Sequence, residues 1–191
     1  MIEEIIYKIL FFILFFVFIL IRQYYSKKYT VNQSLIDVYP LIIKVILLLC
    51  ALTIVIAPIV YCLTPFLDQF YFTLPDEVRI IGIVLLLVSV ICMWWILLNL
   101  KNNFNQDSDS RYLVITGPYK VVRHPMYTIF IIQSISQAML SANVILLSGI
   151  IFTFLVMVLR VKFEDEILIE EFGDEYKKYK ASKQALIPKI W

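Results

Sequence analysis

The stretch Pro125–Leu159, PMYTIFIIQSISQAMLSANVILLSGIIFTFLVMVL, decides the fold that this sequence predicts. It consists of two apolar segments, Pro125–Leu140 and Val144–Leu159, separated only by Ser141-Ala142-Asn143. A transmembrane helix needs roughly 17 to 25 apolar residues, so both segments lie near the lower limit. Because the connection between them is so short, the sequence predicts a tight helical hairpin.

Three further apolar segments precede this hairpin. They are Ile5–Ile21, Leu41–Leu63 and Ile80–Leu100. The chain of 191 residues is 61% hydrophobic, with a mean hydropathy of +0.85, whereas soluble domains are about 45–50% apolar. We therefore expect an all-α integral membrane protein with five transmembrane helices. Residues 1–191 form one domain in this prediction, with three spans in 1–100 and the functional part in 101–191.

Lysines and arginines are distributed unevenly around the predicted spans. Most of the 17 follow the first span, lie between the third and fourth spans, or follow the fifth. Cytoplasmic flanks accumulate such residues, so we expect an outside N-terminus and a cytoplasmic C-terminus. After Arg160, apolar residues continue at helical spacing with glutamates between them, which predicts a cytoplasmic amphipathic helix. Gly173 is a poor helix former and is expected to bend or end this helix.

Polar residues cluster at both ends of the predicted hairpin. The runs Gly117-Pro118-Tyr119 and Arg123-His124-Pro125-Met126-Tyr127 lie at its start, and Arg160 and Glu164 follow its end. A charge costs roughly 2.5–3.5 kcal/mol at the centre of a spanning helix, so charges kept at the membrane boundary typically serve an ion, a substrate or a cofactor. The hairpin brings the two groups together. We interpret them as one active site that faces the cytoplasm.

Both groups also have purely structural interpretations. Pro125 suits the first turn of a helix, so His124 could simply cap or pack at the helix start. Arg160 and Glu164 are four residues apart and could form an ion pair within one helix, although arginine before glutamate is the less favourable order. The crowding of polar and aromatic residues around His124, with Tyr127 three residues further on, favours the functional interpretation.

The combined pattern resembles the isoprenylcysteine carboxyl methyltransferase family and is similar to its small five-span prokaryotic members. It comprises Leu113-Val114-x-x-Gly117-Pro118-Tyr119-x-x-x-Arg123-His124-Pro125-x-Tyr127, Arg160-x-x-x-Glu164, Glu170-Glu171-Phe172-Gly173-x-Glu175-Tyr176-x-x-Tyr179 and Pro188. The resemblance covers about half of the chain, from Asn99 to Trp191. Separately, the run Arg-His-Pro-x-Tyr also resembles phospholipid methyltransferases and membrane sterol reductases.

The resemblance implies S-adenosylmethionine as methyl donor, bound at the cytoplasmic side. The cofactor-binding positions that it implies are Arg111, Tyr112, Leu113, Val114, Tyr119, His124, Pro125, Met126, Tyr127 and Glu164. Arg160 matches the substrate-side arginine of the family and is the catalytic residue in this prediction. The loop 105–110 resembles a shortened form of the loop in eukaryotic members, which leaves Gln106 without an assigned role.

Elementary chemistry agrees with these roles. A sulfonium donor is a cation that the face of Tyr119 or Tyr127 can attract by about 0.5–2 kcal/mol. Glu164 could accept a hydrogen bond from the ammonium or a ribose hydroxyl of the donor. A carboxylate acceptor has no proton to lose at neutral pH, so the transfer depends on alignment and on exclusion of water, and Arg160 would orient the acceptor.

The resemblance implies carboxyl O-methylation of a prenylcysteine-like substrate. The residues themselves leave the acceptor open between a prenylated cysteine, a lipid amine and a quinone-like phenol. Methylation of a lipid amine would need a general base, which Glu164, Asp165 or Glu166 could supply. A reductase that uses NADPH and a membrane subunit without enzymatic activity are further alternatives. The net charge of +2 gives no indication of nucleic acid binding, and the cysteines Cys50, Cys62 and Cys92 lie inside apolar segments. The expected partners are therefore a lipophilic or lipidated acceptor and membrane lipids, without nucleic acid or metal.

Overall fold

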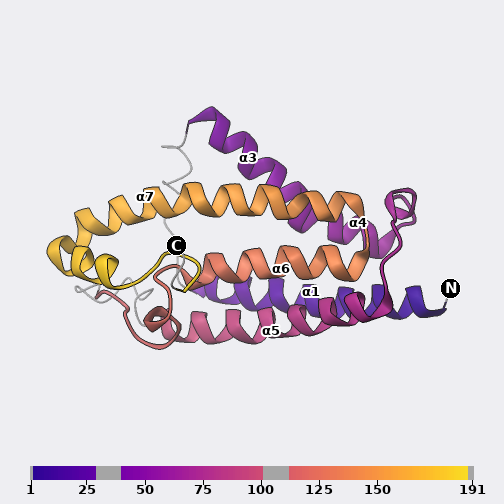
Figure 1. Ribbon diagram of the computed structural model, residues 1–191, viewed down its shortest axis with the longest axis horizontal. Helices are drawn as coiled ribbons and strands as arrows, with labels where there is room; N and C mark the ends of the chain where they lie inside the picture. Colours follow the sequence, from indigo (N-terminus) through magenta and orange to yellow (C-terminus); the bar gives the residue numbers. More distant parts are fainter. Residues whose placement is uncertain (1, 29–39, 101–111, 189–191) are drawn as a thin grey trace.

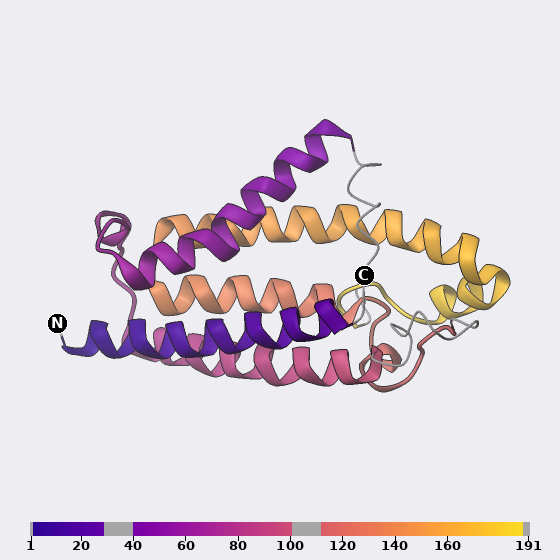
Figure 2. The same ribbon diagram turned by 180° about the vertical axis from the view of Figure 1, so that it is seen from behind.

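The computed structural model describes residues 2–28, 40–100 and 112–188, and most of these residues are helical. Four helices run along the long axis of the molecule (Figure 1): α1 (Ile2–Lys28), α5 (Asp76–Leu100), α6 (Pro125–Ser141) and α7 (Val144–Ser182). A further helical rod diverges from them at one end (Figure 2), and it consists of α3 (Leu41–Ala51), the π-helical turn η1 (Leu52–Ile56) and α4 (Ala57–Leu63). Within the described ranges, β pairing is limited to one bridge between Tyr71 and Asn143.

Four helices are long and apolar enough to cross a membrane. They comprise Glu4–Tyr25 within α1, the rod Leu41–Leu63, α5 and α7. These agree with the first, second, third and fifth predicted spans, so the prediction of an all-α chain with membrane-length helices is confirmed for the described residues. The fourth predicted span corresponds to α6, which has 17 residues and buries several polar side chains. Its crossing of the membrane stays a prediction.

The turn between α6 and α7 is tight, as the sequence predicted. Ala142 has a positive φ of 48°, and Asn143 caps α7 by accepting a hydrogen bond from the backbone N–H of Ile145 at 3.0 Å. The same Asn143 donates from its side-chain amide to the backbone oxygen of Leu67 at 2.7 Å. The backbone N–H of Phe72 donates to the oxygen of Ala142 at 2.9 Å. The turn is therefore buried against the connection that leads into α5.

Near this turn, close packing and a partly buried ion pair hold the helices together. A Cβ on Gly82 would lie 2.8 Å from the backbone nitrogen of Leu140, so this glycine allows α5 to approach α6 closely. Nearby, the buried Arg79 contacts Glu4 of α1 at 2.7 Å and donates from Nε to the oxygen of Leu140 at 3.0 Å. Since Tyr61 also donates to Glu4, one carboxylate links α1, α4 and α5.

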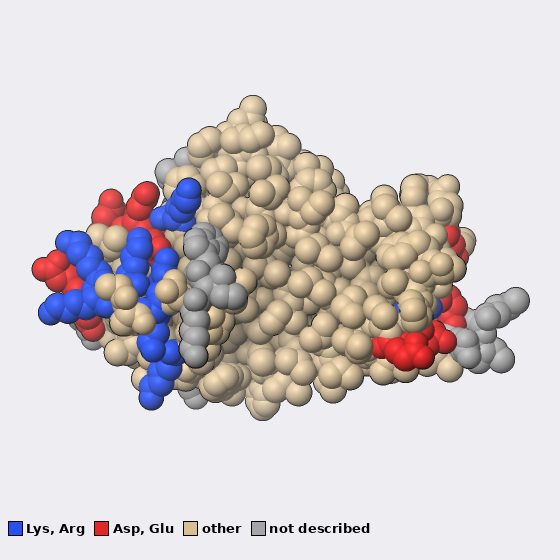
Figure 3. All heavy atoms as spheres, viewed as in Figure 1, with Lys and Arg blue, Asp and Glu red and all other residues tan. Residues whose placement is uncertain are grey.

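Gly173 bends α7 sharply, as predicted. Its φ of 56° and ψ of −129° interrupt the helical backbone, and residues 174–182 fold back toward the start of α6. The segment that follows bonds to that start: the N–H groups of Arg123 and His124 donate to the oxygens of Gln184 and Ala185 at 2.9 and 3.0 Å. Figure 3 shows that lysines and arginines gather at this end of the molecule, whereas the opposite end presents mainly acidic side chains.

Candidate active site

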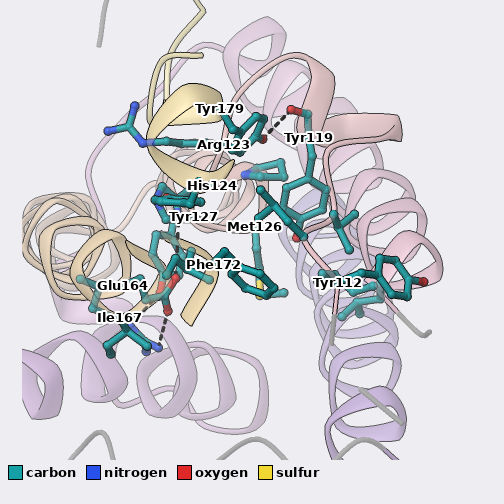
Figure 4. Close-up of a pocket in the computed structure, with 18 of the residues that line it drawn as sticks. Tyr112, Tyr119, Arg123, His124, Met126, Tyr127, Glu164, Ile167, Phe172 and Tyr179 are labelled. Atoms are coloured by element: carbon teal, nitrogen blue, oxygen red, sulfur yellow. Dashed lines mark hydrogen bonds and ion pairs between the residues drawn. The ribbon is translucent and has the colours of Figure 1, made fainter. Parts of the chain in front are cut away.

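A cavity of about 430 Å³ lies where the start of α6 faces α7. Small-molecule sites usually have volumes of about 300–1,000 Å³, so the cavity is large enough for a cofactor or substrate. Its walls come from the ends of α1 and α5, the loop before α6, the first turn of α6 and the part of α7 on both sides of Gly173 (Figure 4). Segments that are far apart in the sequence therefore share one site.

Every predicted site residue that the structure describes lines this cavity. These residues are Tyr112, Leu113, Val114, Tyr119, His124, Pro125, Met126, Tyr127, Arg160 and Glu164. Arg111, together with the loop 105–110 and Gln106, lies outside the described residues. The structure thus brings the two ends of the hairpin into one cavity, while the roles of these residues in binding and catalysis stay predictions.

A glycine turn positions Tyr119. Gly117 begins η3 (Gly117–Lys120) with a φ of 57°, a left-handed conformation that favours glycine. A Cβ at this position would also lie 2.4 Å from Oδ1 of Asn99 at the end of α5. The hydroxyl of Tyr179 in α7 donates to the backbone oxygen of Tyr119 at 2.7 Å. The loop is therefore held against α5 on one side and against α7 on the other.

Glu164 and Arg160 are joined through Tyr127. The Tyr127 hydroxyl donates to Oε1 of Glu164, and Nε of Arg160 donates to the Tyr127 oxygen at 3.1 Å. Nη2 of Arg160 lies 3.3 Å from the same Oε1, and the guanidinium carbon lies 5.4 Å from the centre of the Tyr127 ring. The ion pair expected from the spacing of four is thus present. Because both side chains also line the cavity, the structural and functional interpretations are compatible.

The structural alternative for His124 was capping or packing at the start of α6; its side chain packs there, buried against Tyr127, and does not cap the helix. His124 occupies the N-cap position, but its side chain makes no cap hydrogen bond. Its ring stacks on Tyr127 with 5.5 Å between ring centres, and its nitrogens face two carboxylates, Nε2 at 2.9 Å from Asp165 and Nδ1 at 3.5 Å from Glu164. Burial lowers the pKa of His124, but these carboxylates outweigh it and raise the pKa above its ordinary value.

Sequence reasoning missed the structural importance of Asp165, which it considered only as a possible base. This carboxylate is buried and contacts Arg123 through both oxygens, at 3.2 and 3.1 Å. Lys180 lies 3.1 Å from Oδ2, and the hydroxyl of Tyr176 donates to Oδ1. Arg123 and Tyr176 both belong to the motif quoted above. Their presence in one motif could have indicated that they share an acidic partner such as Asp165.

Apolar residues complete the wall of the cavity. The side chains of Leu97 and Leu100 come from α5, and Ile167, Leu168 and Phe172 come from α7. The residues of α7 belong to the apolar face predicted from the helical spacing after Arg160. Together with the charged Arg160 and Glu164, they make a site that can accommodate a ligand with both a polar and an apolar part.

Comparison with known proteins gives a match in the same region. A model of the isoprenylcysteine carboxyl methyltransferase family matches residues 81–170. The chain is 36% identical over 70 residues to methanethiol S-methyltransferase 1 of Bradyrhizobium diazoefficiens. The matched segment covers 37% of this chain and 24% of that protein.

Two relatives carry the name protein-S-isoprenylcysteine O-methyltransferase. The Xenopus laevis protein is 30% identical over 117 residues, covering 58% of this chain and 41% of its own length. The Dictyostelium discoideum protein is 34% identical over 86 residues, covering 44% and 36% respectively. The matched segments thus span less than half the length of each relative. The match to the isoprenylcysteine carboxyl methyltransferase family covers a little under half of this chain, residues 81–170, and that part includes His124, Arg160 and Glu164.

Proposed function

We propose that this protein transfers a methyl group from S-adenosylmethionine to an amphiphilic acceptor in the membrane, by carboxyl O-methylation of a prenylcysteine-like substrate. The observation that carries the proposal is the shared cavity, in which the polar start of α6 meets Arg160 and Glu164 of α7. The family match to residues 81–170 covers most of these groups and supports methyl transfer as the type of reaction.

The chemistry of the cavity fits such a donor. Glu164 has a side chain that is 28% exposed, so its carboxylate is available to an ammonium or a ribose hydroxyl. The rings of Tyr119 and Tyr127 can attract a cationic sulfonium. When bound, S-adenosylmethionine supplies the methyl group, and the chain supplies its orientation. We assign donor contacts to Glu164 and to the lining residues of the loop 112–114, of η3 and of the first turn of α6.

Arg160 is the group suited to an acceptor carboxylate. Its guanidinium is 30% exposed at the cavity and presents several N–H donors in a fixed fork, which matches a carboxylate in two-point contact. Its link to Tyr127 and Glu164 holds the fork next to the proposed donor contacts. Since a carboxylate needs no base at neutral pH, the task of the chain is to align the two reactants.

The membrane arrangement that we propose has five spans, with α6 as the fourth, and a cytoplasmic site. A helix of 17 residues rises about 26 Å, close to the hydrocarbon thickness. Arg123 and Arg160 line the cavity, Lys180 pairs with Asp165, and the backbone oxygen of Lys183 accepts from Arg123. These basic residues at the cavity end support the cytoplasmic orientation. The apolar wall from α5 and α7 provides contacts for a lipophilic tail. We treat residues 1–191 as one functional domain on this basis.

Methylation of a lipid amine is less well supported. It would need a base, yet Asp165 is buried among four partners and Glu164 is bound to Arg160 and Tyr127. Glu166 is exposed and is not part of the cavity wall. A thiol acceptor deserves a test, because one relative is a methanethiol S-methyltransferase.

The decisive experiment uses purified protein in lipid nanodiscs with S-adenosylmethionine that carries a labelled methyl group. A prenylcysteine with a free carboxylate, its methyl ester, phosphatidylethanolamine and methanethiol are offered separately, and the products are identified by mass spectrometry. We expect transfer to the free carboxylate and none to its ester. Transfer only to the amine or only to the thiol would replace the proposed acceptor. Binding of NADPH in place of S-adenosylmethionine would contradict methyl transfer altogether.

A further inference from the structure

The adjacent acids Glu164 and Asp165 differ in their access to the cavity. The side chain of Glu164 is 28% exposed and lines the cavity, whereas that of Asp165 is 4% exposed and does not line it. The proposed function uses Glu164 but leaves the buried acid without a role. Because Asp165 cannot touch a ligand in the cavity, any effect that it has on the reaction must pass through another side chain.

The oxygens of Asp165 are already fully used by the protein. Oδ1 accepts from Arg123 at 3.2 Å, from the hydroxyl of Tyr176, and lies 2.9 Å from Nε2 of His124. Oδ2 accepts from Arg123 at 3.1 Å and lies 3.1 Å from Lys180. A carboxylate offers about four acceptor positions, so nothing remains for a substrate or cofactor. Of these partners, His124 also has a contact with Glu164, through Nδ1 at 3.5 Å.

The ring of His124 connects the two acids. Nε2 faces Asp165, and Nδ1 lies 3.5 Å from Oε2 of Glu164. A neutral imidazole has one N–H and one lone pair, so one of its nitrogens would direct a lone pair at a carboxylate oxygen. A doubly protonated ring presents an N–H to each acid and avoids this repulsion. The geometry therefore fits an imidazolium between two carboxylates.

Each element that packs near the His124 ring contributes ionisable groups. They are Arg123 before α6, Tyr127 in α6, Glu164 and Asp165 in α7, and Tyr176 and Lys180 beyond Gly173. The charges of Arg123 and Lys180 disfavour a positive charge on the His124 ring, but both side chains are paired with Asp165. Burial lowers the pKa of His124, and the two carboxylates outweigh it and raise the pKa.

We propose that Asp165 is a positioning residue that holds His124 as a doubly protonated ring, so that Nδ1 of His124 fixes the carboxylate of Glu164 for the methyl donor. This inference rests on the proposed function, because it assigns Glu164 to the donor. One oxygen of Glu164 is held by Tyr127 and Arg160, and the other is held by His124. The carboxylate is then oriented before the donor binds, which reduces the entropy lost on binding.

The first test needs no substitution. His124 is the one histidine in the 191-residue sequence, so isotope-labelled histidine gives a single set of ring signals in nuclear magnetic resonance spectra of the protein in nanodiscs. We expect both ring nitrogens to be protonated at neutral pH. We also expect the titration midpoint to lie above that of an exposed histidine. A ring that is neutral at neutral pH would overturn the proposal.

The second test replaces Asp165 with Asn, with Asp174→Asn as the matched control. Asp174 lies on the same helix, its side chain is 84% exposed, and it pairs with Lys177 at the surface. In D165N we expect the titration midpoint of His124 to fall by about one pH unit or more. We expect the affinity for S-adenosylmethionine at neutral pH, measured by calorimetry, to fall about tenfold. The pH above which affinity is lost should move down with the midpoint, and Asp165→Glu should restore part of both.

A merely structural Asp165 gives a different result. D165N would then lower the melting temperature but leave the His124 titration and the pH profile of donor affinity unchanged, which would overturn the proposal. If D165N does not fold, Tyr176→Phe removes one competing donor from the carboxylate and should raise the His124 midpoint; an unchanged midpoint would count against the proposal. Failure of the wild-type protein to bind S-adenosylmethionine would contradict the proposed function, whereas the His124 titration would still test the effect of Asp165.

Discussion

Replacing Glu164 with Gln should weaken donor binding in a measurable and selective way. The substitution keeps the shape of the side chain but removes the charge that we assign to the ammonium or ribose of S-adenosylmethionine. A hydrogen bond to a charged group contributes about 1.5–3 kcal/mol. The Glu164 side chain is 28% exposed, so solvent screening favours the lower half of this range. A loss of about 1.5–2 kcal/mol corresponds to a roughly 10–30-fold higher Kd.

The assay is titration calorimetry of S-adenosylmethionine into the protein in nanodiscs. Glu166→Gln is the matched control, because Glu166 lies two residues further along α7, is exposed and is not part of the cavity wall. Melting temperatures of both variants show whether the loss of the contacts to Tyr127, Arg160 and His124 has unfolded the site. If folded E164Q binds the donor as tightly as E166Q does, then Glu164 is not a donor contact and the assignment fails.

Three further predictions follow from the same geometry. Arg160→Lys removes the two-point fork, and we expect kcat to fall by roughly 10–100-fold with little change in donor Kd, as single-turnover methyl transfer would measure; a normal rate would exclude Arg160 from acceptor orientation. The raised pKa of His124 stabilises the fold fully below the ordinary histidine pKa and less as pH rises through the folded value. The melting temperature should therefore decline over that pH window, and His124→Asn should flatten the decline; a parallel decline in H124N would assign it to other groups. Gly117→Ala places a side chain at a φ of 57° and 2.4 Å from Asn99, and should destabilise the protein by about 1–3 kcal/mol in thermal unfolding. Removing the neighbour with Asn99→Ala should recover only the steric part of that loss, and full recovery would show that backbone strain is negligible.

Local and periodic features of the sequence predicted most of the helices. The predicted span Leu41–Leu63 coincides with the rod of α3, η1 and α4, and Pro125 and Val144 begin α6 and α7 as expected. The bend at Gly173 was also predictable, because a glycine interrupts an otherwise regular helical pattern. The helices α1 and α5 extend beyond their predicted spans, since polar residues at their ends are compatible with a helix but not with an apolar segment.

Contacts between distant segments could not be predicted in this way. The pairing of Arg79 with Glu4 joins residues 75 positions apart, and neither residue belongs to a motif that indicates the other. The residues after α7 bond to the start of α6 through backbone groups, as in the contact between His124 and Ala185. Such bonds depend on the path of the chain and not on the identity of a side chain.

The sequence by itself determined that the chain is apolar enough for a membrane, where its helices lie, and which motif residues gather at the ends of the hairpin. The tertiary structure alone decided which of the two adjacent acids lines the cavity. Successive residues of an α-helix point about 100° apart, so Glu164 and Asp165 are directed toward different neighbours. The rotation of α7 about its own axis, which its packing against α6 and α3 fixes, directs Glu164 into the cavity and Asp165 into the buried contacts with Arg123 and His124.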